Sequence, residues 1–191
     1  TNWITHALKI SDNTETEMIA RHTELALGLK NHYSSVQKMG KMLFASLGVN
    51  ASKLVMKDAS GLAPNNRVTA QLLVALMSSA SDPASDISSL TTYMATSGDG
   101  GTLSGRFFAY NSVTKRKELV IPKGSIRAKT GFIGGLYSLA GVVTTSGTEP
   151  HKIAFAIFAR NDSAHKKYVG SGTKDAIDGI VEKLYLCGPS L

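Results

Sequence analysis

Apolar residues in the first half of the chain recur at the spacing of amphipathic helices. The first such segment opens with polar positions, among them Glu15 and Glu17, whose negative charges favour the positive end of a helix. Gly48 follows the second segment as a C-terminal stop, and Thr69 precedes the third as an N-terminal cap. The pattern predicts helices over residues 13–30, 34–47, 69–77 and 85–95.

The C-terminal third changes to the alternating pattern of β-strands. Short turn-forming segments separate residues 125–130, 136–145 and 152–160, so these three predict an antiparallel meander. The chain closes with an amphipathic helix that we expect Thr173 to cap. Its apolar positions are Ile177, Ile180, Val181 and Leu184. Residues 53–57 are predicted as a short strand, residues 98–101 as a turn and residues 115–117 as a loop.

This order of elements predicts the fold class. Helices followed by an antiparallel sheet and a covering helix are typical of an α+β domain with two or three layers. A chain of 191 residues suits one well-cored domain, and no repeat, low-complexity tract or linker divides it. With 42% hydrophobic and 18% charged residues, the composition is that of a globular protein.

The net charge of +7 favours anionic partners. Basic residues cluster only at 115–117 and 166–167, and aromatic residues are not interleaved with them as in single-strand binders. We therefore expect no nucleic-acid partner. No apolar run approaches the roughly 20 residues that span a bilayer, so no transmembrane segment is expected. The lone Cys187 excludes an intrachain disulfide, the histidines lack metal-ligand spacing, and we expect neither a metal nor a cofactor.

Two short polar motifs, Ser11-Asp12-Asn13 and Lys129-Thr130-Gly131, carry the candidate chemistry. Taken singly, each is common, because the first also suits a helix cap and the second a strand that ends in glycine. Together and in this order they match two of the three motifs of β-lactamases and penicillin-binding proteins. The remaining motif in those proteins is an upstream Ser-x-x-Lys.

Two further segments lie between these motifs, Asp58-Ala59-Ser60-Gly61-Leu62 and Gly101-Thr102-Leu103 with Arg106. With them, the chain resembles the C-terminal part of a low-molecular-mass penicillin-binding protein of the type-4 D-alanyl-D-alanine carboxypeptidase/endopeptidase family. The resemblance implies a penicillin-binding-protein/β-lactamase-like transpeptidase domain. Residues 1–191 would carry its second and third active-site motifs, with the N-terminal portion absent from this chain.

The resemblance also implies a substrate and a role for each motif residue. The substrate would be a peptidoglycan stem peptide that ends in D-Ala-D-Ala, with β-lactams as its mimics, outside the cytoplasmic membrane. Ser11 would relay a proton to the leaving amine, and Asn13 would hold the substrate backbone, while Asp12 fixes the turn. Lys129 would supply positive charge and Thr130 a hydroxyl donor for the terminal carboxylate. Gly131 would let an extended substrate lie against the strand.

The Ser-x-x-Lys nucleophile motif does not occur before Ser11. Matches at residues 35–38, 112–115, 163–166 and 171–174 lie downstream and are interpreted as surface residues. We therefore expect the N-terminal remainder of the same polypeptide to supply the nucleophile, and this chain alone to be inactive. One alternative is a β-lactamase, although no glutamate lies between Glu24 and Glu118 to serve as the class A base. The other is a non-catalytic peptidoglycan-binding module of the same fold.

Overall fold

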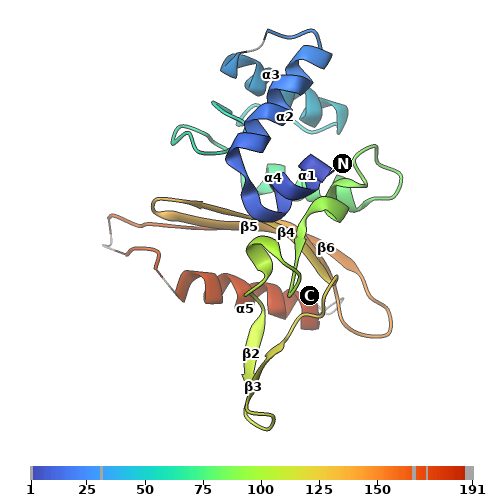
Figure 1. Cartoon of the computed structure of the whole chain (residues 1–191), viewed down its shortest axis with the longest axis vertical. Coiled ribbons are helices and arrows are strands. Elements are labelled where there is room, and N and C mark those ends of the chain that lie inside the picture. The colour runs from blue at the N-terminus through green and yellow to red at the C-terminus, as the bar shows by residue number, and fades with distance from the viewer. Residues whose placement is uncertain (1, 31, 165–166, 171, 188–191) are drawn as a thin grey trace.

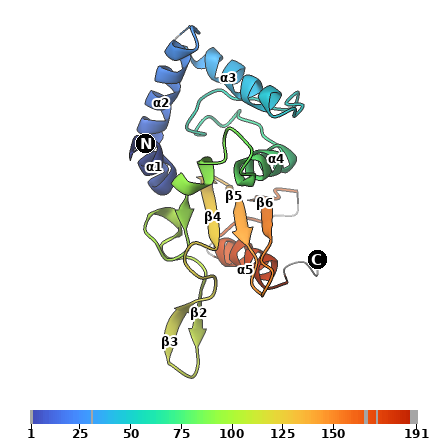
Figure 2. The ribbon, with the colours of Figure 1, turned by 90° about the vertical axis from the view of Figure 1, so that its right-hand side faces the viewer.

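The computed structural model describes residues 2–30, 32–164, 167–170 and 172–187. The N-terminal helices lie on one side of a four-stranded antiparallel sheet, and α5 (Gly172–Cys187) covers the other side (Figures 1 and 2). The N-terminal elements are α1 (Asn2–His6), the π-helical turn η1 (Ala7–Ser11), α2 (Asn13–Ala26), α3 (Tyr33–Ser46) and α4 (Ala70–Ser81). The predicted α+β class with an antiparallel sheet is confirmed.

Side-chain and glycine signals place the ends of the first helices. Asp12 caps α2 by accepting a 2.8 Å hydrogen bond from the backbone N–H of Glu15. The helix ends before residue 30 because Gly28 takes a φ of +64°, which lets the next amide bond back to the carbonyl of Glu24. Gly48, with a φ of +70°, ends α3 in the same way, as predicted.

Helix α4 also begins as predicted, because the Thr69 hydroxyl accepts from the backbone N–H of Leu72. It continues to Ser81, beyond the predicted end. The helix predicted over residues 85–95 is wrong, since turns and the short 3-10 helix η2 (Leu90–Tyr93) take its place. Local side chains bind the backbone at the start of this segment, where the Asp82 carboxylate accepts from Ala84 N and the Ser85 hydroxyl accepts from Ile87 N.

The predicted strand over residues 53–57 is reduced to one bridge between Val55 and Arg67. The Gln37 side chain takes the positions that a neighbouring strand would occupy. Its amide oxygen accepts from Met56 N at 2.7 Å, and its amide nitrogen donates to Leu54 O at 3.1 Å. A distant side chain therefore satisfies this segment's backbone in place of a ladder.

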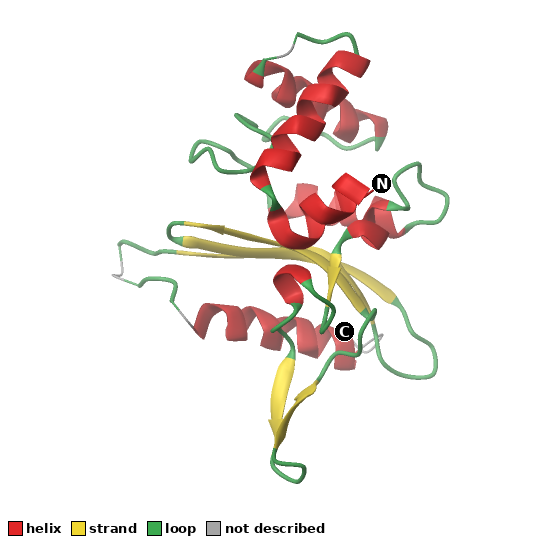
Figure 3. Cartoon of the chain, viewed as in Figure 1, coloured by secondary structure: helices red, strands yellow, loops and turns green. Residues whose placement is uncertain are grey.

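The predicted meander is confirmed, and Figure 3 shows its strands in yellow. The sheet order is β1-β4-β5-β6, with β1 (Ala95–Thr96), β4 (Ile126–Ile133), β5 (Leu136–Thr144) and β6 (Lys152–Arg160). A separate hairpin, β2 (Phe108–Asn111) and β3 (Arg116–Leu119), follows the 3-10 turn η3 (Gly101–Leu103). The loop predicted over residues 115–117 is therefore partly wrong, because Arg116 and Lys117 pair with β2.

The main core lies between the sheet and α5. Ile177 and Val181 of the helix pack against buried sheet residues such as Ile126 and Leu139. Ile180 is 50% exposed and so lies off the buried face, unlike the prediction. Thr173 lies inside the first turn and is not the cap; its hydroxyl accepts from Gly170 N.

A buried ion pair joins α5 to the segment that follows η3. The Arg106 guanidinium donates to the Asp178 carboxylate, with Nε to Oδ1 at 2.9 Å and Nη2 to Oδ1 at 2.5 Å. Both side chains are nearly buried, at 12% and 11% exposure. Because a buried charge without its partner is costly, this pair fixes the η3 segment against the covering helix.

We predict that Asp178→Ala lowers the free energy of unfolding by about 3–5 kcal/mol, because it leaves the Arg106 cation buried and unpaired. Urea unfolding of the chain measures this loss. Asp175→Ala in the same helix is the control, since Asp175 is exposed and contributes only through the helix dipole, at most about 1 kcal/mol. Equal unfolding midpoints for the two variants would contradict the assignment.

Candidate active site

Ser11 and Lys129, 118 positions apart in the sequence, meet where η1 ends against β4. The Lys129 ammonium Nζ donates to Ser11 Oγ at 2.5 Å and to the carbonyl of Thr130 at 2.8 Å. Ser11 has a φ of +64°, a left-handed conformation that costs energy for a residue with a Cβ. The fold thus holds the serine in a strained position that presents its hydroxyl to the lysine.

Burial sets the protonation of Lys129. The Lys129 side chain is largely buried where β4 meets η1. This burial removes water from the ammonium and lowers the pKa of Lys129 from 10.5 to about 8. Its hydrogen-bond partners are a hydroxyl and a carbonyl, which are both neutral. Lys129 is therefore a cation at neutral pH that only neutral groups compensate within the described part of the chain.

The turn that carries Ser11 rests on Gly101, the first residue of η3. Gly101 has a φ of +68°, and a Cβ at this position would collide with the carbonyl of Lys9. Asp99 lies 4.0 Å from Lys9 Nζ and 2.9 Å from Lys123 Nζ. Sequence reasoning identified the Gly-Thr-Leu segment but missed its contact with η1, because nothing in the spacing of residues 9 and 101 indicates proximity.

The Lys129-Thr130-Gly131 motif lies on a partly open strand edge. Within the described residues, β1 pairs with β4 only at Arg127 and Ala128, so residues 129–133 have no strand on that side. On the other side, Gly131 pairs with Ser138, whose hydroxyl occupies the space that a Cβ at position 131 would need. The glycine is thus required by strand packing as well as being compatible with an extended ligand.

Asn13 lies one residue beyond the cap of α2 and is exposed. With Thr14 and Glu17 it lines an open hollow whose opposite wall is the loop over residues 57–63. The structure therefore joins Ser11 to Lys129 directly, and places Asn13 beside a different segment, the Asp58-Ala59-Ser60-Gly61-Leu62 motif.

Glu17 ties this loop to α2. Its Oε1 accepts from the backbone N–H groups of Ala59 at 2.9 Å and Ser60 at 2.8 Å. Burial opposes the ionised form of Glu17, but the loop hydrogen bonds and Arg21 outweigh it, and the pKa of Glu17 is lowered. The residue lies one helical turn after Asn13, and this spacing is the sequence signal for its role.

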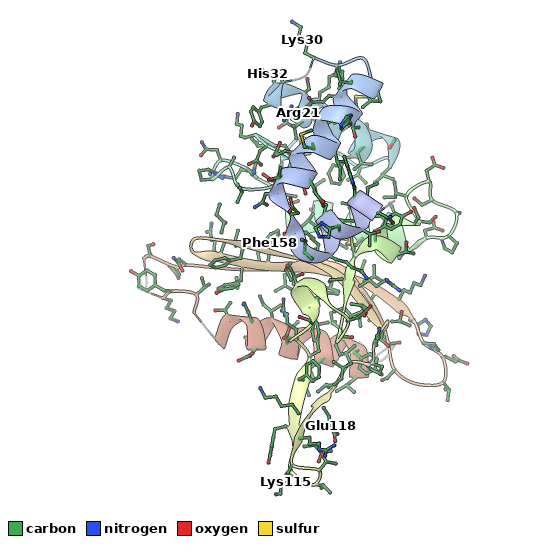
Figure 4. The ribbon with its side chains drawn as sticks, viewed as in Figure 1. Arg21, Lys30, His32, Lys115, Glu118 and Phe158 are labelled. Atoms are coloured by element: carbon green, nitrogen blue, oxygen red, sulfur yellow. The ribbon has the colours of Figure 1, made fainter. Side chains whose placement is uncertain are left out.

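Arg21 supports Glu17 from the next turn of α2, where Figure 4 labels it. It donates to the Glu17 carboxylate at 3.2 Å and to the fully buried Glu24 at 2.7 Å. The guanidinium also lies 4.6 Å from the centre of the Tyr33 ring. Asp58 fixes the loop from within by accepting from Gly61 N and Ala63 N.

Two of the downstream Ser-x-x-Lys matches, at residues 35–38 and 112–115, lie in α3 and in the turn between β2 and β3. Ser35 is buried and donates to the carbonyl of Lys30, so its interpretation as a surface serine is wrong. Ser112 and Lys115 lie in the turn between β2 and β3, where Figure 4 labels Lys115. Lys166 and Ser171, which belong to the other two matches, lie outside the described residues.

An α+β fold in which a helix-borne Ser-Asp-Asn meets a strand-borne Lys-Thr-Gly is typical of penicillin-binding proteins and class A β-lactamases. The profile of the D-Ala-D-Ala carboxypeptidase 3 (S13) family matches residues 1–184. The chain therefore belongs to this family.

Among characterised proteins, the chain is similar to carboxypeptidase DacB of Mycolicibacterium smegmatis, with 30% identity over 181 residues. This alignment covers 93% of the chain and 36% of that protein. A carboxypeptidase of Mycobacterium tuberculosis is 28% identical over 186 residues, which cover 97% of the chain and 37% of the relative. The chain thus spans little more than a third of the length of these carboxypeptidases.

Solved structures show the same fold at lower identity. Penicillin binding protein 4 of Haemophilus influenzae matches with a TM-score of 0.72 and 21% identity, over 97% of this chain and 39% of that one. The same protein has been solved in complex with a β-lactam. A predatory peptidoglycan endopeptidase of Bdellovibrio bacteriovorus matches with a TM-score of 0.61 and 19% identity, over 96% and 42% of the two chains.

We predict that Lys129 makes the stability of the chain depend on alkaline pH. The folded state binds this proton less tightly than the unfolded chain, so stability rises as the pH increases from about 8 towards 10.5. The free energy of unfolding increases by at most about 3 kcal/mol over this pH range. Urea midpoints across this range should show it for the natural chain and for the control Lys57→Met, but not for Lys129→Met. Parallel pH profiles for all three would refute the shift.

We also predict that Glu17→Ala frees the loop over residues 57–63. Loss of the acceptor should speed hydrogen exchange of the Ala59 and Ser60 amides by roughly tenfold or more. Glu17→Gln keeps one acceptor oxygen and should change exchange less. Glu15→Ala, which removes an exposed partner of His6 in the same turn, is the control. If Glu15→Ala and Glu17→Ala have equal effects at these amides, Glu17 does not hold the loop.

Proposed function

We propose that this chain forms part of a serine-type D-Ala-D-Ala carboxypeptidase/endopeptidase that cleaves peptidoglycan peptides through an acyl-enzyme. The observation that carries the proposal is the contact between Lys129 Nζ and Ser11 Oγ, which joins the two motifs. The nucleophilic Ser-x-x-Lys would come from sequence outside this chain. Residues 1–191 would then be the portion of the peptidase domain with the second and third motifs, and would be inactive alone.

The direction of the hydrogen bond suits Ser11 for proton transfer. A hydroxyl has one donor and two acceptor sites, and Lys129 already occupies one acceptor site. The Ser11 proton therefore remains available for a leaving amine on the nucleophile side. After this transfer, the Lys129 cation stabilises the developing negative charge on Oγ, and an incoming water can return a proton in the deacylation step.

Substrate alignment follows from the strand edge and the start of α2. An extended peptide could pair with the open edge of residues 129–133 and present its terminal carboxylate to Lys129 and the Thr130 hydroxyl. The Asn13 side chain, which both donates and accepts, suits the opposite side of the peptide backbone. Peptidoglycan stem peptides and β-lactams are the proposed ligands, which implies an extracytoplasmic location.

The alternative of a β-lactamase is not proposed, because the family match is to carboxypeptidases. A non-catalytic peptidoglycan-binding module remains the second candidate. It is favoured by the same open strand edge, which can hold a peptide without a nucleophile.

Fluorescent penicillin distinguishes these functions. We predict no covalent labelling of this chain alone, and labelling of the longer polypeptide that includes the Ser-x-x-Lys segment. In that polypeptide, Lys129→Glu should reduce labelling and D-Ala release by about a hundredfold or more, because it reverses the charge at the carboxylate site. Lys53→Glu, at an exposed lysine, is the control.

Failure of the longer polypeptide to take up label, with peptide binding retained, would favour the non-catalytic module. Undiminished turnover by Lys129→Glu would overturn the assignment of Lys129.

A further inference from the structure

The hairpin of β2 and β3 projects away from the sheet and from α5, at the end of the molecule opposite α3 (Figures 1 and 4). Its base is anchored in the main core by the buried Phe107 and the partly buried Leu119. Backbone pairing continues past the strands at the base of the hairpin, where Val120 N donates to Phe107 O at 2.7 Å. The hairpin is thus a protrusion with a firm base.

Polar side chains hold the tip in shape. Asn111 donates to the Glu118 carboxylate at 2.7 Å, and the Thr114 hydroxyl donates to it at 2.6 Å. The Asn111 side-chain oxygen accepts from the backbone N–H of Val113 at 2.9 Å. These bonds offset the marginal stability of a two-stranded ribbon. The tip therefore does not need apolar packing for its conformation.

The tip nevertheless exposes apolar side chains. Tyr110 is 63% exposed and Val113 is 87% exposed. The strand register pairs Tyr110 with Lys117 and Phe108 with Leu119, so the aromatic rings share one face with a lysine. Tyr110 and Val113 are therefore accessible to a partner at the tip of the hairpin.

The charges around these apolar groups are mainly positive. Lys115, Arg116 and Lys117 follow one another at the tip, and Glu118 is the one carboxylate among residues 108–119. Hydrogen bonds from Thr114 and then Asn111 lower the pKa of Glu118, so its negative charge is held within the hairpin. The tip therefore carries three cations, with Lys117 on the same face as Tyr110 and Arg116 on the opposite face.

We propose that this hairpin tip, residues 110–117, binds the surface of an anionic phospholipid bilayer. Lysine and arginine are attracted to anionic headgroups, and tyrosine is favoured at the headgroup level. A projecting tip can reach a flat, deformable surface, whereas a protein groove would have to enclose it. This proposal does not depend on the proposed peptidase activity. Within the described residues, no helix is long and apolar enough to cross a bilayer.

Cosedimentation with vesicles tests the electrostatic part. We expect the chain to bind vesicles of equal parts phosphatidylglycerol and phosphatidylcholine, and to bind phosphatidylcholine vesicles at least about tenfold less, since each cation contributes roughly fivefold. The variant K115Q/R116Q/K117Q should lose at least about tenfold in binding. The control K38Q/K41Q/K53Q removes the same charge from exposed lysines at the other end of the molecule and should lose little. Equal losses would mean that only net charge acts, and would overturn the proposal.

A second variant tests the apolar part without changing charge. Val113→Ser should weaken binding to the anionic vesicles by about three- to tenfold at high salt, where electrostatic attraction is screened. Val68→Ser, at another exposed valine, is the control and should leave binding unchanged. In the longer polypeptide, binding to anionic vesicles must depend on the same hairpin residues. If it does not, another part of that polypeptide covers the tip and the proposal is wrong.

Discussion

The hydrogen bond between Lys129 and Ser11 is the interaction on which the site depends, because it joins the start of the chain to the central sheet. Ser11 makes this bond from a left-handed conformation, and the surrounding structure must supply the energy for that conformation. Gly101 lies close to Lys9 and so holds η3 against η1. The ion pair between Arg106 and Asp178 anchors the segment after η3 to α5. The covering helix on the far side of the sheet therefore contributes indirectly to the position of the motif serine.

Local signals predicted the elements whose ends are set by neighbouring residues. The caps at Asp12 and Thr69 and the stop at Gly48 act within one helical turn, so they can be identified from sequence. The errors occurred where a distant or polar side chain competes for the backbone. Gln37 takes the partners of the 53–57 strand, and its position depends on the tertiary fold.

In the candidate site too, local sequence features were predictable and long-range contacts were not. Its motif residues were identified because their order along the chain is distinctive, but their contacts were beyond sequence reasoning. Ser11 meets Lys129 across 118 positions, and Glu17 reaches the amides of Ala59 and Ser60 across more than 40. The hairpin was missed because its strands are exposed on both faces, and so lack the apolar alternation that marks a half-buried strand.

The burial of Lys129 has a consequence for ligand binding. An isolated cation with neutral partners is poorly compensated, which is why its pKa falls to about 8. A carboxylate that binds beside it would replace the lost solvation and raise the pKa again. By linkage, such a ligand binds the protonated lysine more tightly than the neutral one. The same desolvation that destabilises the unliganded site therefore favours an anionic ligand over a neutral one beside Lys129, which supports the proposed binding of a terminal carboxylate at this strand edge.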